Sequence, residues 1–307
     1  MTTTTIKTVR NIKDLRKAVA TWRGAGETVA LVPTMGALHD GHIALVKLAR
    51  KMAARVVVSI FVNPTQFAAN EDLSRYPRDE AGDLAKLTHA KADLVWAPCV
   101  EVMYSQGFAT RIEPAGAALG LEADIRPEHF SGVATVCAKL FNQVMPDVAI
   151  FGEKDYQQLC VIRQLVRDLD FNLKIIGLPT VREKDGLARS SRNRYLSEHE
   201  RAIAPALYAE LSKLAADVQR LAMSAKSAVN KSAGNKSAGN ATASLDALCR
   251  EASQRLLAKG FKTVDYVAVR DASTLAPITQ LTEQSNLRVL AAARLGPTRL
   301  IDNVPVN

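Results

Sequence analysis

At residues 33–42 the chain reads Pro-Thr-Met-Gly-Ala-Leu-His-Asp-Gly-His, between an apolar run at 29–32 and a helix-like pattern at 43–49. A strand, a glycine-containing turn and a helix start form the arrangement in which backbone N–H groups bind a phosphate. His39 and His42 are three residues apart and therefore share a face of the expected helix, while Gly41 lets a ligand approach the backbone. The stretch predicts a nucleotide site whose phosphates are bound by two histidines and a helix end.

Three well-known site patterns do not match this stretch. No Gly-Lys-Ser/Thr follows the glycines, so it is not a Walker loop, and the Gly-x-Gly-x-x-Gly spacing of the dinucleotide fingerprint is missing. A His-Glu-x-x-His zinc helix needs histidines four apart with a glutamate beside the first. A simple polar surface turn is the alternative, and the ordered strand–turn–helix context argues against it.

Short β-rich runs alternate with helical patterns as far as about residue 180. Residues 55–62 form a continuous apolar run typical of a strand buried on both faces. This alternation predicts an α/β fold built on a doubly wound, parallel, Rossmann-like sheet. Ligands bind such sheets beyond the carboxyl ends of the strands, so the polar clusters at 34–42, 63–67 and 152–158 should converge on one crevice. Further strands are expected at 93–98, 147–152 and 173–177, and helices at 79–91, 132–144 and 156–169.

The pattern changes after residue 180, which predicts two domains, 1–180 and 181–307. Residues 197–223 read as one long helix, begun by Ser197 with Glu200 three residues on, the capping-box pattern. Residues 224–244 contain a tandem Asn-Lys-Ser-Ala-Gly and are expected to be a flexible surface insertion. A helix at 245–259 and strands at 264–269, 287–293 and 299–303 complete a smaller α+β domain with a short antiparallel sheet.

Composition excludes several classes of protein. With 307 residues, 48% of them hydrophobic, the chain can bury a large core, yet it has no apolar run long enough for a membrane span. The N-terminus lacks the pattern of a signal peptide, and four scattered cysteines form no Cys-x-x-Cys pair, so a cytoplasmic location is expected. The net charge of +9 is spread along the chain without interleaved aromatic residues, which favours an anionic small molecule over nucleic acid.

Four further segments carry polar chemistry. Lys154 and Asp155 lie at a strand–helix junction, where the lysine suits a phosphate and the aspartate either caps the helix or accepts from a ribose hydroxyl. The basic, serine-containing loop at 181–194 is either an interdomain linker or a set of donors for a polyphosphate. Gln66 follows a rigid turn and either binds a polar substrate or belongs to a plain turn. His129 either joins the site or caps a helix.

Taken together, these segments resemble the pantoate–β-alanine ligase (pantothenate synthetase) family of the nucleotidylyltransferase superfamily. The resemblance covers nearly the whole chain and is strongest from Pro33 to about Leu196. It depends on the ordered combination of 32–42, 61–67, 76–78, 151–158 and 190–196, because the His-x-Gly-His element alone indicates only the superfamily.

The resemblance implies an ATP-dependent ligase that condenses pantoate with β-alanine through a pantoyl-adenylate, releasing pyrophosphate and AMP. Its substrates would be small molecules, with Mg²⁺ bridging the phosphates, and the protein would be a homodimer that binds neither nucleic acid nor membranes. By resemblance, catalysis falls to His39, His42, Lys154, Ser190, Ser191 and Arg192. ATP would be bound by these residues together with Met35, Gly36, Gly41, Gly152, Asp155 and Val181, and pantoate by Gln66, Gln158, Phe67 and Met35.

The chain departs from the family pattern in two places. Asp83 matches an acidic position near the metal, but Gly82 precedes it where some relatives have a second acid, so Asp83 is the one candidate metal ligand. The insertion at 224–244 is the other departure. Two alternatives remain: another adenylyl- or cytidylyltransferase of the superfamily, and an RNA-binding module.

Overall fold

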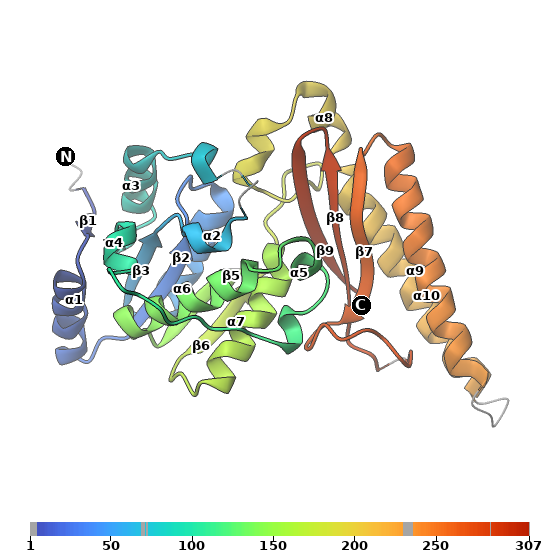
Figure 1. Ribbon diagram of the computed structural model, residues 1–307, viewed down its shortest axis with the longest axis horizontal. Coiled ribbons are helices and arrows are strands. Elements are labelled where there is room, and N and C mark those ends of the chain that lie inside the picture. Colours follow the sequence, from blue (N-terminus) through green and yellow to red (C-terminus); the bar gives the residue numbers. More distant parts are fainter. Residues whose placement is uncertain (1–4, 69–70, 72, 230–235, 283, 307) are drawn as a thin grey trace. The chain divides into compact units, whose positions relative to one another are not determined.

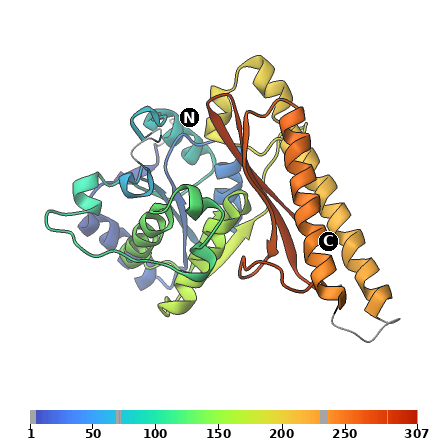
Figure 2. The same cartoon turned by 45° about the vertical axis from the view of Figure 1, so that its right-hand side comes forward.

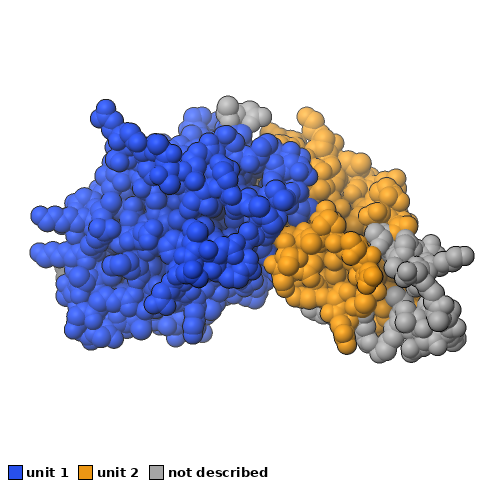
Figure 3. Space-filling view, turned by 60° about the horizontal axis from the view of Figure 1, so that its bottom comes forward, with its two compact units in different colours: residues 1–181 blue, residues 182–307 orange. Residues whose placement is uncertain are grey.

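The computed structural model describes residues 5–306 except 69–70, 72, 230–235 and 283. The chain divides into two compact units, residues 1–181 and 182–307 (Figures 1 and 3). Among the described residues, no helix combines the length and the apolar composition needed to cross a membrane.

The first unit contains a six-stranded parallel sheet in the order β1-β4-β3-β2-β5-β6. Its central strands are short apolar runs buried on both faces, which is why they lack polar alternation. The predicted doubly wound α/β fold is therefore confirmed. The strands are β1 (Lys7–Val9), β2 (Val29–Thr34), β3 (Arg55–Ile60), β4 (Leu94–Trp96), β5 (Val148–Gly152) and β6 (Lys174–Leu178).

Helices cover both faces of this sheet (Figure 1). On one face, α2 (Asp40–Met52) and α3 (Glu80–His89) bury Leu45, Val46 and Leu87 against alternate residues of the strands. The other face carries α1 (Ile12–Gly24), α6 (His129–Val144) and α7 (Tyr156–Asp168), which contact one another in that order. The strand β1 and the helix α1 were not expected from the sequence. Two one-turn helices, α4 (Val100–Met103) and α5 (Glu122–Ile125), lie in the connection before α6.

The two ends of the sheet differ in chemistry. At the amino end, carboxylates accept backbone N–H groups at the starts of two strands. Asp147 Oδ2 accepts the Val29 N–H at 2.7 Å, and Asp93 Oδ2 accepts the Val56 N–H at 2.8 Å. At the carboxyl end, β2, β3 and β5 run into polar turns. The strand order reverses between β2 and β5, which makes their carboxyl ends the switch point at which such sheets bind ligands.

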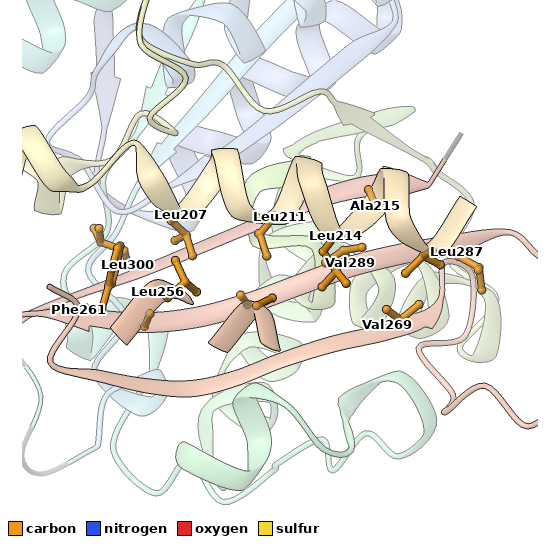
Figure 4. Close-up of a cluster of buried hydrophobic side chains, with 14 of the residues drawn as sticks. Leu207, Leu211, Leu214, Ala215, Leu256, Phe261, Val269, Leu287, Val289 and Leu300 are labelled. Atoms are coloured by element: carbon orange, nitrogen blue, oxygen red, sulfur yellow. The ribbon is translucent and has the colours of Figure 1, made fainter. Parts of the chain in front are cut away.

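The second unit packs two long helices on an antiparallel sheet of β7 (Thr263–Asp271), β8 (Leu287–Leu295) and β9 (Thr298–Val306). The helices α9 (Ala206–Val229) and α10 (Lys236–Ala258) lie side by side on one face of that sheet (Figure 2). Leu207, Leu211 and Leu214 repeat at helical spacing and are fully buried against alternate residues of β8 such as Val289 (Figure 4).

Two expectations for this unit need correction. The single helix predicted at 197–223 is broken into α8 (Glu198–Ile203) and α9, because Pro205 has no N–H to continue the helical ladder. The predicted capping box of Ser197 and Glu200 does begin α8. In the segment 224–244, α9 continues to Val229 and α10 begins at Lys236, so its described parts are helical, consistent with its many alanines. Residues 230–235 lie outside the described residues.

Candidate active site

The turn after β2 has an unusual backbone. Gly36 (φ +82°) and Ala37 (φ +50°) are both left-handed, a conformation that costs energy for a residue with a Cβ. Thr34 Oγ1 donates to the Ser59 carbonyl of β3 at 2.7 Å and accepts the Gly36 N–H at 3.2 Å. The turn is thus anchored to the neighbouring strand and delivers the chain to the start of α2.

His39 and His42 form the first turn of α2 as a reciprocal cap. Nδ1 of His39 accepts the Gly41 N–H at 3.1 Å, and Nδ1 of His42 accepts the His39 N–H at 3.3 Å. The ring centroids are 4.1 Å apart. Since each Nδ1 accepts a backbone N–H, the proton of each neutral ring is assigned to Nε2. The helix start therefore holds two imidazoles in one tautomer.

The His42 ring is neutral over the physiological pH range. Desolvation by the surrounding protein, followed by the charges of His39, Lys154 and Lys86, lowers the pKa of His42 to about 3. The ring is therefore an N–H donor without a positive charge of its own. The cationic field around it comes from the lysines, and that field suits a polyphosphate.

Lys154 reaches this region from the end of β5. It lies in a 3₁₀ turn, η4 (Glu153–Asp155), between Gly152 and the first residue of α7. Its Nζ is 3.7 Å from Asp155 Oδ2, and its side chain is only 21% exposed. A lysine held at the edge of the sheet beside the β2 turn can contact a ligand that lies over both strands.

Gln66 brings the turn after β3 to the turn after β2. Its Nε2 donates to Met35 Sδ at 3.4 Å, and its Oε1 accepts from Asn63 Nδ2 at 3.0 Å. Asn63 is 1% exposed, and the same amide nitrogen donates to the Gly132 carbonyl of α6 at 3.2 Å. Gly132 must be glycine because a Cβ there would lie 2.3 Å from the Thr65 carbonyl oxygen.

His129 holds the backbone of Gln66. Its Nδ1–H donates to the Gln66 carbonyl at 3.0 Å, and Arg126 Nη2 donates to the same oxygen at 3.2 Å. Arg126 is in turn paired with Glu71 through two nitrogens. Desolvation and the nearby Arg126 charge lower the pKa of His129 to about 4. Of the two interpretations of His129, the geometry favours the one in which it supports the site.

Several other predicted residues lie in the first unit. Gly41 is in the first turn of α2, Phe67 packs edge-on against Tyr76 with ring centroids 5.9 Å apart, and Val181 is the last residue of the unit. Gln158 is partly exposed in the first turn of α7. Its neighbour Gln157 is buried and bonded to backbone groups at Ala117, Gly120 and Glu122, which leaves Gln158 as the glutamine suited to a ligand.

Ser190, Ser191 and Arg192 belong to the second unit. Ser190 Oγ accepts the Arg192 N–H at 3.2 Å and so caps the short helix η5 (Ser191–Tyr195). Asn193 Nδ2 ties this helix to the Ala188 carbonyl at 3.0 Å. The segment is an ordered, basic helix start, and its role toward ATP remains a prediction.

Asp83 does not fit the predicted role of metal ligand. Its side chain is 1% exposed, and Oδ1 accepts the Leu38 N–H at 2.7 Å. A carboxylate that binds a hydrated cation must present its oxygens to that ion, whereas this one is directed into the β2 turn. Within the described part of the chain, no group of three His, Cys, Asp or Glu side chains is placed to hold a metal ion.

The sequence and structure match known proteins over nearly their full length. A family model described as pantoate-beta-alanine ligase fits residues 7–305. The chain belongs to this family. A pantothenate synthetase from Mesorhizobium japonicum is 52% identical to this chain, and the alignment covers 97% of each chain. A second, from Paramagnetospirillum magneticum, is 51% identical, and the alignment covers 99% of each chain. Membership confirms the predicted enzyme class and the ATP-dependent formation of pantothenate.

Solved structures agree with this assignment. A pantothenate synthetase from Thermus thermophilus superposes on the ligase with a TM-score of 0.80 at 46% identity, covering 98% of this chain and 99% of the other. A pantoate-beta-alanine ligase from Francisella tularensis, described as complexed with beta-gamma ATP and beta-alanine, has a TM-score of 0.75 at 32% identity and covers 98% of each chain.

Some supporting residues of the ligase site have no local sequence signal. Arg126 and Glu71 are 55 positions apart, and Tyr104, whose hydroxyl donates to Asn63 Oδ1 at 2.7 Å, is 41 positions from it. Lys86 donates to the Leu38 carbonyl at 2.8 Å. Lys86 lies three residues after Asp83 on the same helix face. That spacing is the only sequence signal that could have suggested that the two side chains act on the same residue.

Proposed function

We propose that the ligase makes pantothenate in two half-reactions over the carboxyl ends of β2, β3 and β5. A pantoate carboxylate oxygen attacks the α-phosphorus of ATP, and the bond from that phosphorus to pyrophosphate breaks. The deprotonated amine of β-alanine then attacks the carbonyl carbon of the pantoyl-adenylate. The bond to AMP breaks, the nitrogen loses its proton, and pantothenate and AMP leave.

The observation that carries this proposal is the locked histidine pair. With Nδ1 of His39 and His42 engaged by backbone N–H groups, the proton of each neutral ring is on Nε2, and we assign these N–H groups to phosphate oxygens of ATP. Donors already in place where negative charge develops are the main catalytic device for such a transfer. We assign Lys154 to the same phosphates as a mobile point charge.

The remaining contacts are assigned from the resemblance to the family. Met35, Gly36, Gly41 and Val181 would contact ATP, with Gly152 and Asp155 at the ribose. Gln66, Gln158 and Phe67 would bind pantoate, with Gln66 pre-oriented by Asn63 and His129. On the same resemblance, Ser190, Ser191 and Arg192 are assigned to the ATP phosphates as well.

We infer that Mg²⁺ enters as a complex with ATP, whose phosphate oxygens are its usual ligands. No step is assigned to it through Asp83, which faces the turn. A cytoplasmic location and a homodimer complete the proposal. Light scattering during size-exclusion chromatography tests the dimer, and a mass equal to one chain would contradict it.

A quenched-flow experiment separates this chemistry from that of a simple adenylyltransferase. With ATP and pantoate alone, the ligase should release about one pyrophosphate per site and then stop, because the adenylate stays bound. Addition of β-alanine should start steady release of AMP. Continued AMP formation without β-alanine, under multiple turnover, would contradict the proposed sequence. Saturable binding of RNA at physiological salt would instead support the RNA-binding alternative.

A further inference from the structure

One helix holds both backbone groups of the residue that precedes the histidine cap. Asp83 Oδ1 accepts the Leu38 N–H at 2.7 Å, and Lys86 Nζ donates to the Leu38 carbonyl at 2.8 Å. Both side chains come from α3, three residues apart, with Nζ 3.8 Å from Asp83 Oδ1. Leu38 is directly followed by His39, so this clamp sets the backbone where the cap begins.

The turn has a physical need for such a clamp. Gly36 and Ala37 are consecutive residues with positive φ, a conformation that costs energy for Ala37 because it has a Cβ. The Asp83 carboxylate accepts a backbone N–H group of this turn. It interacts with the backbone of Ala37 as well as Leu38.

The fit is close on the other side of the carboxylate as well. A Cβ built on Gly36 would lie 3.2 Å from Asp83 Oδ2 and 3.2 Å from Ile60 Cγ2. The carboxylate therefore packs directly on the glycine backbone and is 1% exposed. Nothing in this arrangement directs either oxygen toward the surface on which ATP is proposed to bind.

We propose that Asp83 and Lys86 are positioning residues that hold the β2 turn so that His39 and His42 keep their Nε2–H donors aligned. Asp83 acts through the backbone of Leu38 rather than as a ligand of Mg²⁺. The catalytic consequence depends on the proposed function, while the structural consequence for the two rings does not.

The first test compares Asp83→Asn and Asp83→Ala with Glu80→Gln, which changes an exposed acid on the same helix. In ligand-free protein, long-range ¹H–¹⁵N spectra report the tautomer of each ring. We expect the wild type and Glu80→Gln to show Nε2–H for His39 and His42, and Asp83→Ala to show averaged tautomers. Asp83→Asn keeps one oxygen acceptor and should lie between them.

The second test measures kinetics against Mg²⁺ concentration. Asp83→Ala should lower kcat on the order of tenfold to a hundredfold, the scale of a misplacement of about 1 Å. The Mg²⁺ concentration for half-maximal activity should stay within about twofold, because no metal contact is lost. The Lys86 side chain is 44% exposed, so we expect the Lys86→Met variant to fold. This variant should also lower kcat without changing the Mg²⁺ dependence.

Two results would overturn the inference: unchanged ring spectra in Asp83→Ala and Lys86→Met, or a large rise in the Mg²⁺ requirement of Asp83→Asn at unchanged kcat. If Asp83→Ala does not fold, Asp83→Asn and Lys86→Met decide the question. Failure of the proposed function would look different, since the wild type would then make no pantothenate while the ring spectra still responded to Asp83.

Discussion

The backbone N–H of His39 donates to Nδ1 of His42 at 3.3 Å, so the first residue of the pair sets the tautomer of the second. The relationship is reciprocal within one helical turn, because Nδ1 of His39 accepts the Gly41 N–H. The two imidazoles therefore act as helix caps, and we propose that they are ligand donors at the same time. The capping role uses Nδ1 and leaves Nε2 as the protonated nitrogen of each ring.

Two substitutions at His42 separate these roles. His42→Asn places an amide oxygen near the position of Nδ1 and keeps the cap, but it has no group at Nε2. His42→Gln places an amide nitrogen near Nε2 but loses the Nδ1 acceptor. We expect His42→Asn to keep its stability and lose on the order of a hundredfold in the rate of adenylate formation, the scale of one preorganised donor.

His42→Gln should retain more of that rate and lose on the order of 1 kcal/mol of stability with the cap. Rapid quench for the adenylate and urea unfolding for the free energy of unfolding check both variants. Equal rates for the two would show that Nε2–H has no special role.

The lowered pKa of His42 predicts how stability depends on pH. The folded-state value of about 3 lies below the ordinary 6.5, so the unfolded chain binds a proton that the folded chain does not. Stability should therefore fall as the pH drops from 6.5 toward 3. We expect the wild type to lose on the order of 1 kcal/mol more than His42→Asn between pH 7 and pH 5.

Urea unfolding at both pH values measures this difference, and His129 titrates equally in both proteins and cancels. In ligand-free protein, the His42 ring signals should stay unshifted in NMR spectra from pH 8 to pH 5. A midpoint near pH 6.5 would contradict the burial argument.

His129 should control the binding of pantoate rather than the chemical step. Loss of its Nδ1–H bond to the Gln66 carbonyl loosens the turn that orients the Gln66 amide. We expect His129→Ala to raise KM for pantoate by about tenfold, the free-energy scale of one lost hydrogen bond, with little change in KM for ATP. His129→Asn, which can place an N–H near Nδ1, should restore part of the affinity. Equal increases in both KM values would instead indicate general damage to the site.

The amino end of the sheet offers a control for stability without function. Asp147 accepts the first N–H of β2 and pairs with Arg23 at 2.8 Å, far along the strand from the turns that carry the site. Asp147→Ala should cost about 1–3 kcal/mol of unfolding free energy, because a strand N–H loses its partner. Chemical denaturation measures this loss, and kcat at 25 °C should remain unchanged. A fall in kcat would show that the two ends of the sheet are coupled.

Local patterns were enough to predict the class of fold and the strand–turn–helix junction at 33–42. Apolar runs such as 55–62 indicate strands buried on both faces, and parallel strands place the polar turns that follow them on one edge of the sheet. The prediction at 197–223 was wrong because apolar periodicity continues through Pro205, whereas the backbone ladder cannot. The strand at 7–9 was missed because it is only three residues long, and the helix at 12–24 was not predicted either.

The sequence by itself determined that a glycine-containing turn and a helix start follow β2, since the glycines, the histidines and the flanking runs are contiguous. Only the tertiary structure decided that Asp83 faces the backbone of the β2 turn. It also decided that Gln157, and not Gln158, is hydrogen-bonded to backbone groups, and that His129 contacts the Gln66 carbonyl. Each of these depends on contacts between residues at least 35 positions apart. Local periodicity indicates which face of a helix is buried, but hydrogen-bond partners across a sheet edge are set by how the loops pack.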